Sequence, residues 1–106
     1  MGDDAGKVQV DLAPESRRYE IHVDDKPAGY VGYHRYGDEI AFLHTEVNSD
    51  FEGMGLGSKL ARHVLDDAAE HDMKVLPYCP FISGWIGKHP EYTELVPEER
   101  RPQFHL

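Results

Sequence analysis

The segment from Glu52 to Lys59 carries the clearest chemical signal in the sequence, because glycines stand at its alternate positions 53, 55 and 57. Glycine allows positive φ angles and close approach of the backbone, so that consecutive N–H groups can converge on an anion. A helix that begins at such a loop adds the positive end of its dipole. The segment therefore predicts a phosphate or pyrophosphate ligand, and a flexible connection from a strand to a helix is the alternative interpretation.

Two well-known phosphate-binding motifs do not match this segment. The ATP-binding P-loop has a lysine directly after its last glycine and then a hydroxyl residue, whereas this chain has Gly57-Ser58-Lys59. The dinucleotide fingerprint has a different glycine spacing and opens a strand–helix–strand unit, whereas the residues before this loop have the pattern of an antiparallel meander. The pattern that remains is E-x-x-G-x-G between a strand and a helix.

His44 and Glu46 form a second candidate site, just before the glycines. The two residues are two positions apart in the predicted strand EIAFLHTEV, so their side chains are expected on the same face. Either side chain has the chemistry to take a proton from an amine, directly or through water. The alternatives are a histidine packed in the core and a carboxylate bonded to the backbone of the loop.

Cys79 is the only thiol of the chain, and it ends a short apolar segment just before a predicted helix. A thiolate in that position can attack a thioester and form an acyl-cysteine. Its neighbours include Pro77 and Phe81 but no cation, which favours a thiol that lines the site without reacting, and a purely structural cysteine is the third reading. Tyr78 and Tyr92 are candidates to protonate a departing thiolate, although packing is the more usual role of tyrosine.

The composition limits the classes of protein to consider. The chain has 106 residues, which supports one domain, and its formal net charge of −9 argues against a general nucleic-acid binder. One cysteine excludes a disulfide framework and a multi-cysteine zinc site, and His63 and His71 are too far apart to share an ion, so we expect no metal site. Without a long apolar run or a signal-peptide pattern at the start, we expect a cytoplasmic protein with no membrane partner.

Hydrophobic periodicity predicts the elements that position these groups. Alternating apolar and polar residues predict three antiparallel strands at 18–24, 29–36 and 39–47, joined by a turn at 25–29 and a hairpin at 37–38. The third strand carries apolar residues on both faces near its start, so we expect it to be central in the sheet. Strict alternation places Ile40, Phe42, His44 and Glu46 on one face of this strand.

The second half of the chain changes to a helical period. Apolar residues every four positions predict a helix from Leu56 to about residue 71, then a strand at 73–79 and a short helix at 80–89. Pro77 lacks an N–H, so strand pairing must fail on one side at that position. We divide the chain into a flexible arm at 1–16 with a short strand at 8–10, a domain at 17–96, and a loosely docked tail at 97–106.

The glycine pattern together with three longer strings resembles the GNAT acetyltransferase superfamily. The strings are HTEVNSDFEGMGLGSKL, VLPYCPF and KHPEY, and they are similar to a very short, single-domain branch of predicted N-acetyltransferases. The resemblance covers roughly residues 18–96 and implies a mixed α+β fold with the element order predicted above. Glu52 stands where the family pattern Q/R-x-x-G-x-G/A has Gln or Arg.

The resemblance implies acetyl-CoA as the cosubstrate and a site between two strands that splay apart. The pyrophosphate of CoA would bind at the glycine loop, and its pantetheine arm would bond to the free edge of the strand at 43–47. The resemblance and the residue chemistry together give Glu46, Cys79 and His44 as catalytic candidates. The residues expected to bind CoA are Thr45, Val47, Glu52, Gly53, Met54, Gly55, Leu56, Gly57 and Ser58.

The function that the resemblance implies is transfer of an acetyl group from acetyl-CoA to a small-molecule or peptide amine, by a monomer or a weak homodimer. The chain is short, and it lacks room for the early helices that often shape the acceptor pocket in this family. A CoA-binding module without turnover is therefore the alternative function. A small scaffold without a ligand is a third.

Overall fold

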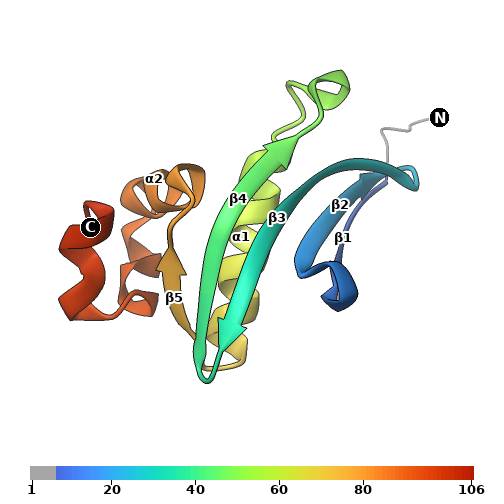
Figure 1. Ribbon diagram of the computed structural model, residues 1–106. Helices are drawn as coiled ribbons and strands as arrows, with labels where there is room; N and C mark the ends of the chain where they lie inside the picture. Colours follow the sequence, from blue (N-terminus) through green and yellow to red (C-terminus); the bar gives the residue numbers. More distant parts are fainter. Residues whose placement is uncertain (1–6) are drawn as a thin grey trace.

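The computed structural model describes residues 7–106, and it contains one five-stranded sheet that a long helix covers on one face (Figure 1). The first four strands pair antiparallel in chain order, and the fifth joins the fourth in parallel. The predicted mixed α+β fold and the central position of the third predicted strand, which is β4, are confirmed. The elements are β1 (Val8–Ala13), β2 (Arg18–Val23), β3 (Lys26–Tyr36), β4 (Glu39–Val47), α1 (Leu56–Glu70), β5 (Lys74–Pro77) and α2 (Pro80–Lys88).

Strand β1 corrects the expected flexible arm. It pairs with β2 along its whole length, from Val8 opposite Val23 to Ala13 opposite Arg18. The expected short strand at 8–10 is therefore longer, and the sheet begins inside the segment that we assigned to the arm. The alternation of Val8 and Val10 is too brief to predict this strand, because an edge strand draws its stability from its neighbour. The rest of the expected arm, residues 1–6, lies outside the described residues.

The turn between β2 and β3 is tighter than expected. Asp24 and Asp25 both have positive φ, at 51° and 67°, as in the two-residue turns that match the twist of a hairpin. The expected turn at 25–29 is therefore wrong, because Lys26 already begins β3. Pro27 is tolerated there because the register with β2 shifts next to it, which forms a bulge.

Strand β4 contains an extra residue at Leu43. Its register with β3 shifts between Phe42 and His44, and Leu43 has no partner. A bulge of this kind reverses the alternation of side chains beyond it. Ile40 and Phe42 are buried in the core, whereas His44 and Glu46 are exposed. The expectation that all four share one face is therefore wrong, because alternation in the sequence does not show an unpaired residue.

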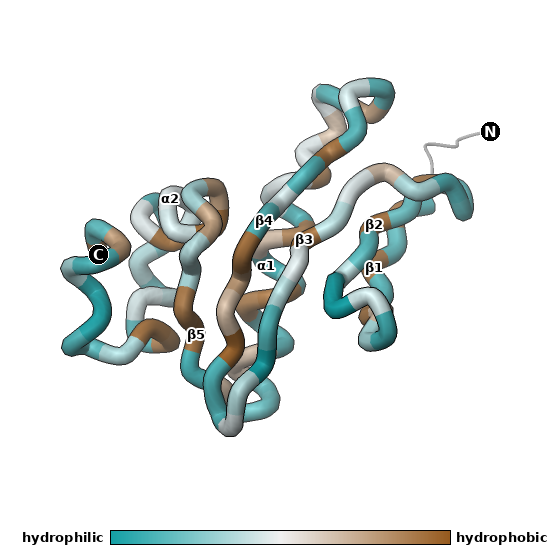
Figure 2. Tube along the Cα trace, viewed as in Figure 1, coloured by the Kyte–Doolittle hydropathy of each residue, from teal (hydrophilic) through white to brown (hydrophobic). Residues whose placement is uncertain are grey.

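The core lies between α1 and one face of the sheet. Helix α1 contacts β2, β3, β4 and β5, and the apolar segments of the chain gather between them (Figure 2). The predicted helix from Leu56 is confirmed, and its C-terminal cap is His71. In Figure 1 no helix formed by residues 7–106 crosses the opposite face of β2, β3 and β4, which these residues leave open. The buried stripe of α1 consists of Leu56, Leu60, Ala61, Val64, Leu65 and Ala68.

The C-terminal residues pack more firmly than expected. They form two 3-10 helices, Pro90–Leu95 and Glu98–Phe104. The side chain of Phe104 is only 6% exposed, and its ring lies 5.2 Å from that of Tyr78 in an edge-to-face contact. The expectation of a loosely docked tail at 97–106 is therefore wrong, because Phe104 belongs to the hydrophobic core and Arg101 donates to the carbonyl of Val96.

Across residues 7–106, no helix has both the length and the apolar character that would be needed to cross a membrane.

Candidate functional site

Strands β4 and β5 pair for only four residues and then separate. Their register runs from Glu39 opposite Lys74 to Phe42 opposite Pro77, and the N–H of Cys79 then donates to the carbonyl of Phe42 at 2.8 Å. Pairing therefore ends at Pro77, as its missing N–H predicted. Beyond this point β5 no longer pairs with the residues of β4, and the two ribbons diverge (Figure 1).

The free edge of β4 presents backbone groups toward this opening. The N–H of Asn48 donates to the carbonyl of Ala28 at 2.7 Å, which makes these two residues a hydrogen-bonded pair. In an antiparallel ladder such pairs alternate with pairs that do not exchange hydrogen bonds. Counting back along the register, Thr45 and Val47 stand in the second kind of pair. Their backbone groups therefore point away from β3, toward the opening, as expected for two residues that bind an extended ligand.

Gly29 brings β3 unusually close to this part of β4. A Cβ atom at Gly29 would lie 2.5 Å from the carbonyl oxygen of Glu46 and 3.1 Å from the Cα of Val47. Only glycine fits there. The path of β4 beside the opening therefore depends on a residue of the neighbouring strand, and sequence reasoning did not single it out.

The glycine loop has the backbone conformation that its sequence predicted. Gly53 and Gly55 have φ angles of +89° and +71°, in the left-handed region that favours glycine. Gly55 is the N-cap of α1, and no side chain caps the helix. The first intrahelical hydrogen bond at this end runs from the N–H of Lys59 to the carbonyl of Gly55. The N–H groups of the first helical turn before Lys59 are therefore without intrahelical partners, and they are suited to bind an anion.

The remaining loop residues differ in what they can offer a ligand. Leu56 is buried, so only its backbone remains available, whereas Glu52 and Met54 are exposed. Gly57 lies against the ring of Phe81, and a Cβ at this position would lie 2.8 Å from Cζ of that exposed ring, which would have to shift. The hydroxyl oxygen of Ser58 accepts a hydrogen bond from Nε1 of Trp85 at 3.2 Å, which joins the start of α1 to α2.

Cys79 lies at the end of the opening and contacts β4. Its Sγ is 3.1 Å from Oγ1 of Thr45, its side chain is only 3% exposed, and its backbone caps α2. The expectation that Cys79 ends its strand is wrong, because β5 ends at Pro77, but Cys79 does directly precede α2. The structure adds the contact with Thr45. This contact brings together a thiol and a hydroxyl from two strands that no longer pair.

His44 and Glu46 lie on the opposite, open face of β4. Nε2 of His44 is 3.3 Å from Oε1 of Glu46, and the hydroxyl of Tyr30 donates to the same oxygen at 3.4 Å. The side chains of His44 and Glu46 are 62% and 63% exposed, which rules out the alternative of a core histidine. The carboxylate of Glu46 contacts these two side chains rather than the backbone of the loop. Tyr30 was missed, although it stands directly opposite Glu46 in the register.

The two tyrosine candidates differ in their surroundings. The hydroxyl of Tyr92 donates to Asp66 at 2.7 Å and accepts from Arg62, and desolvation and the bond to Asp66 raise the pKa of Tyr92. These partners belong to α1. The hydroxyl of Tyr78 accepts a hydrogen bond from Nη2 of Arg100 at 2.7 Å, and Tyr78 precedes Cys79 directly. Arg100 had no sequence signal, because its role depends on how the C-terminal segment folds back.

One group of side chains in residues 7–106 has the spacing of metal ligands. The ligand atoms of Asp67, Glu70 and His71 lie within 4.8 Å of one another on the last turns of α1. Asp67 accepts a hydrogen bond from the hydroxyl of Tyr19, and Nδ1 of His71 lies 2.8 Å from the carbonyl oxygen of Asp67. This group lies outside the opening, and the sequence-based expectation of no metal site stays a prediction.

Proteins of similar length match most of this chain in sequence. A mouse protein, Protein NATD1, is 27% identical over 96 residues, which cover 87% of this chain and 87% of the mouse protein. Protein NATD1 of chicken is 29% identical and covers 82% of this chain and 83% of its own length. Protein NATD1 of human is 34% identical over a shorter stretch of 65 residues, 58% of each chain.

Solved structures share the fold of this chain. The solution structure of a GCN5-like protein from Staphylococcus aureus superimposes with a TM-score of 0.66 at 22% identity, over 84% of this chain and 87% of that one. The crystal structure of ribosomal-protein-alanine N-acetyltransferase from Brucella melitensis gives 0.54 at 17% identity, over 76% and 60% of the two chains. The sequence profile of the GCN5-related N-acetyl-transferase family matches residues 18–95. The resemblance drawn from the sequence is thus confirmed, and the chain belongs to the GCN5-related N-acetyltransferase family.

Proposed function

We propose that the protein transfers an acetyl group from acetyl-CoA to an amine. The observations that carry this proposal are two sets of free backbone groups on either side of the connection from β4 to α1. One set is the N–H groups of the first turn of α1, and the other is the unpaired edge of β4 at Thr45 and Val47, near Cys79, where β4 and β5 separate. Membership in the GCN5-related family supports acetyl-CoA as the ligand of these groups.

The chain's backbone, rather than its charges, holds CoA in this proposal. The N–H groups from Gly53 to Ser58 bind the pyrophosphate, because several of them lack partners and the positive end of α1 lies behind them. The edge of β4 at Thr45 and Val47 pairs with the amide groups of the pantetheine arm, as an added strand would. Backbone donors suit this protein, because a net charge of −9 offers little general attraction for a phosphate.

Side chains on the open face of β4 accept the proton that the attacking amine releases. When bound, acetyl-CoA supplies an activated acetyl group beside Thr45. Glu46 accepts the proton that the attacking amine gives up, directly or through water, and His44 shares that proton through their 3.3 Å contact. Tyr78 lies next to Cys79 and provides a proton for the sulfur that leaves. Most of the rate comes from holding the two reactants in the correct orientation.

Cys79 takes no covalent part in this mechanism. Its thiol is buried and contacts Oγ1 of Thr45, so it shapes the wall of the opening. The amine attacks the acetyl group directly, and the protein is never acetylated. A two-step route through acetyl-cysteine is the mechanism that this assignment rejects, and the two routes differ in the mass of the protein after exposure to acetyl-CoA.

One observation favours a second function, a CoA-binding module without turnover. The connection between β1 and β2 is only the three-residue 3-10 helix Pro14–Ser16. No helix in this connection encloses His44 and Glu46, and both remain exposed to water. Exposure to water makes a general base less effective and weakens its binding of an acceptor.

The deciding experiment measures binding and turnover separately. Calorimetric titration with CoA and with acetyl-CoA tests the binding site, and release of free thiol from acetyl-CoA with a panel of amines tests transfer. Binding together with amine-dependent thiol release supports the enzyme. Binding without release supports the module, and the absence of any binding contradicts both functions.

A further inference from the structure

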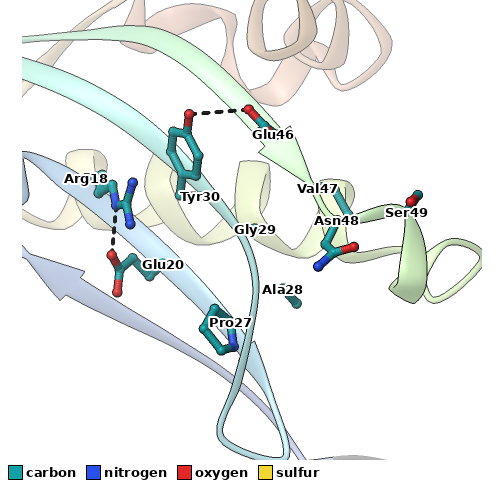
Figure 3. A pocket seen from close by; sticks show the side chains of 10 residues that line it. All are labelled: Arg18, Glu20, Pro27, Ala28, Gly29, Tyr30, Glu46, Val47, Asn48 and Ser49. Atoms are coloured by element: carbon teal, nitrogen blue, oxygen red, sulfur yellow. Dashed lines mark hydrogen bonds and ion pairs between the residues drawn. The ribbon is translucent and has the colours of Figure 1, made fainter.

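A hollow on the open face of the sheet lies directly beside the proposed site. It has a volume of about 550 Å³, which suits a small ligand, and side chains from β2, β3 and β4 surround it (Figure 3). It shares Glu46 with the pair of side chains that handles the proton. The lining residues are Arg18, Glu20, Pro27, Ala28, Gly29, Tyr30, Glu46, Val47, Asn48 and Ser49.

The hollow is reached from the side of the sheet that α1 leaves open. Helix α1 and the core fill the other face, where Phe42 is fully buried. His44 and Glu46 project from β4 on the open side, and Thr45 between them turns to Cys79. Glu46 and Thr45 therefore serve opposite faces of β4, so a molecule in the hollow meets Glu46 from the face opposite Thr45, and Val47 borders the hollow beside it.

Around the hollow, the negatively charged side chains outnumber the positively charged ones. Among the residues that the structure describes, Arg18 is the one cationic side chain of the hollow. Nε of Arg18 is bound to Oε2 of Glu20 at 2.7 Å, and its guanidinium lies 4.5 Å from the centre of the ring of Tyr30. Glu20 thus neutralises Arg18. Within residues 7–106 no lysine or arginine lies within ion-pair distance of Glu46, whose contacts are His44 and Tyr30. The hollow therefore carries one carboxylate in excess.

We propose that this hollow is the acceptor site and that it selects small primary amines that lack a carboxylate beside the amine. An ammonium group is attracted to Glu46, and an alkyl or aryl chain lies against Tyr30 and Pro27. A carboxylate on the ligand would face Glu46, and its only cationic partner is already held by Glu20. This inference deepens the proposed function and rests on it for the statement that the bound amine is the acetyl acceptor.

The test compares pairs of ligands that differ by one carboxylate. Putrescine is compared with ornithine, and phenethylamine with phenylalanine, by titration of the isotope-labelled full chain without CoA and observation of its backbone amide signals. We expect saturable shifts at residues 28–30 and 46–49, with each amine binding at least about fivefold more tightly than its amino acid, as expected for one exposed charge.

Two substitutions test the cause of the preference. Glu20→Gln releases Arg18 to meet a ligand carboxylate, so the preference for the amine should shrink or reverse. Glu46→Gln removes the excess charge, so binding of both amines should weaken. Glu91→Gln removes an exposed carboxylate outside the hollow and is the matched control, which should leave both affinities unchanged.

The outcomes separate this inference from the proposed function. If amines do not shift these amides, if amino acids bind equally well, or if Glu20→Gln leaves the preference intact, the acceptor assignment is overturned, even where thiol release shows an active enzyme. If amines bind as expected while acetyl-CoA releases no thiol, the hollow is an amine site, and the proposed transferase activity fails instead.

Discussion

The glycine loop and the open face of β4 are built in opposite ways. The loop offers backbone N–H groups whose positions are fixed by positive φ angles and by the start of α1. The open face offers exposed side chains, His44 and Glu46, which bond to each other and to Tyr30. Ligand binding by a backbone site depends on the conformation of the chain and little on the chemistry of its side chains. The activity of a side-chain site depends mainly on the chemistry of those side chains. Substitutions that change one property at a time should therefore separate the two regions.

The largest effect should come from the charge on the open face. Glu46→Gln keeps the shape of the side chain and removes the base, so turnover should fall by a factor on the order of 100, with CoA affinity nearly unchanged. Steady-state kinetics and calorimetric titration measure the two quantities. Glu91→Gln is again the control, because it removes an equal charge from an exposed position. Unchanged turnover in a folded Glu46→Gln protein would assign Glu46 to structure.

The next effect should come from the backbone of the loop. Gly55→Val places a β-branched residue at a φ of +71°, where such residues are strained by about 1–3 kcal/mol, so the loop should change conformation. We expect CoA affinity to fall at least about tenfold in a protein that still folds. No atom lies within 4 Å of an added Cβ, so the effect is conformational rather than a clash within the protein.

A matched control exists for this prediction. Gly37, in the hairpin between β3 and β4, has a φ of +62° and equally open surroundings. Gly37→Val should therefore cost similar stability, measured by denaturant unfolding, without a change in CoA affinity. If both variants bind CoA equally weakly, general destabilisation explains the loss and the loop has no special role.

A smaller effect should appear in the stability of the frame that carries the loop. The hydroxyl of Tyr19 on β2 donates to Asp67 on α1, and burial, followed by that hydrogen bond, raises the pKa of Tyr19. A tyrosine whose pKa is higher in the folded than in the unfolded protein stabilises the folded state at pH values below its unfolded-state pKa, near 10. This stabilisation is lost as the pH rises above about 10. The free energy of unfolding should therefore fall above about pH 10, by roughly 1 kcal/mol per pH unit.

Tyr19→Phe removes both the hydrogen bond and the titrating group. It should be less stable at neutral pH by about 1 kcal/mol and should show a flatter dependence above about pH 10. Urea unfolding at several pH values measures both properties. An equally steep loss in the variant would show that other groups dominate the alkaline response.

The smallest effect should come from Cys79, whose thiol contacts Thr45 beside the splayed edge of β4. Cys79→Ala should keep most of the activity, because the thiol lines the opening and does not carry the acetyl group. Intact-mass spectrometry after incubation with acetyl-CoA should find no acetyl adduct. A stoichiometric adduct on the peptide that contains Cys79, removed when an amine is added, would establish the two-step route.

The features that the sequence predicted correctly depend on local chemistry. The positive φ angles of Gly53 and Gly55, the start of α1 at Leu56, and the end of β5 pairing at Pro77 all follow from properties of the residues themselves. The bulge at Leu43 does not, because it depends on how two strands match in length. For this reason the alternating pattern placed His44 and Glu46 on the core face of β4 instead of the open face. It correctly placed the two residues on the same face as each other.

Other features depend on contacts between distant segments. The anchoring of the C-terminal residues depends on Phe104 meeting Tyr78, and the bond from Arg100 to Tyr78 follows from that contact. The hollow requires Arg18 to stand beside Tyr30, which only the register of β2 and β3 brings about. A charged tail and an alternating strand look alike in the sequence whether or not they take part in a site.

The bulge at Leu43 has a consequence for how this chain can change over evolutionary time. Between Leu43 and Asn48, neighbouring residues meet different reactants, because the side chains of His44 and Glu46 project from the open face while the backbone groups of Thr45 and Val47 face the splayed edge. Point substitutions can therefore alter acceptor preference without touching the donor contacts. A deletion of Leu43 itself would remove the bulge and leave both sets on their present faces. A deletion of a paired residue such as Thr45 would instead move the residues beyond it to the other face, so the paired part of this stretch should accept substitutions far more readily than deletions.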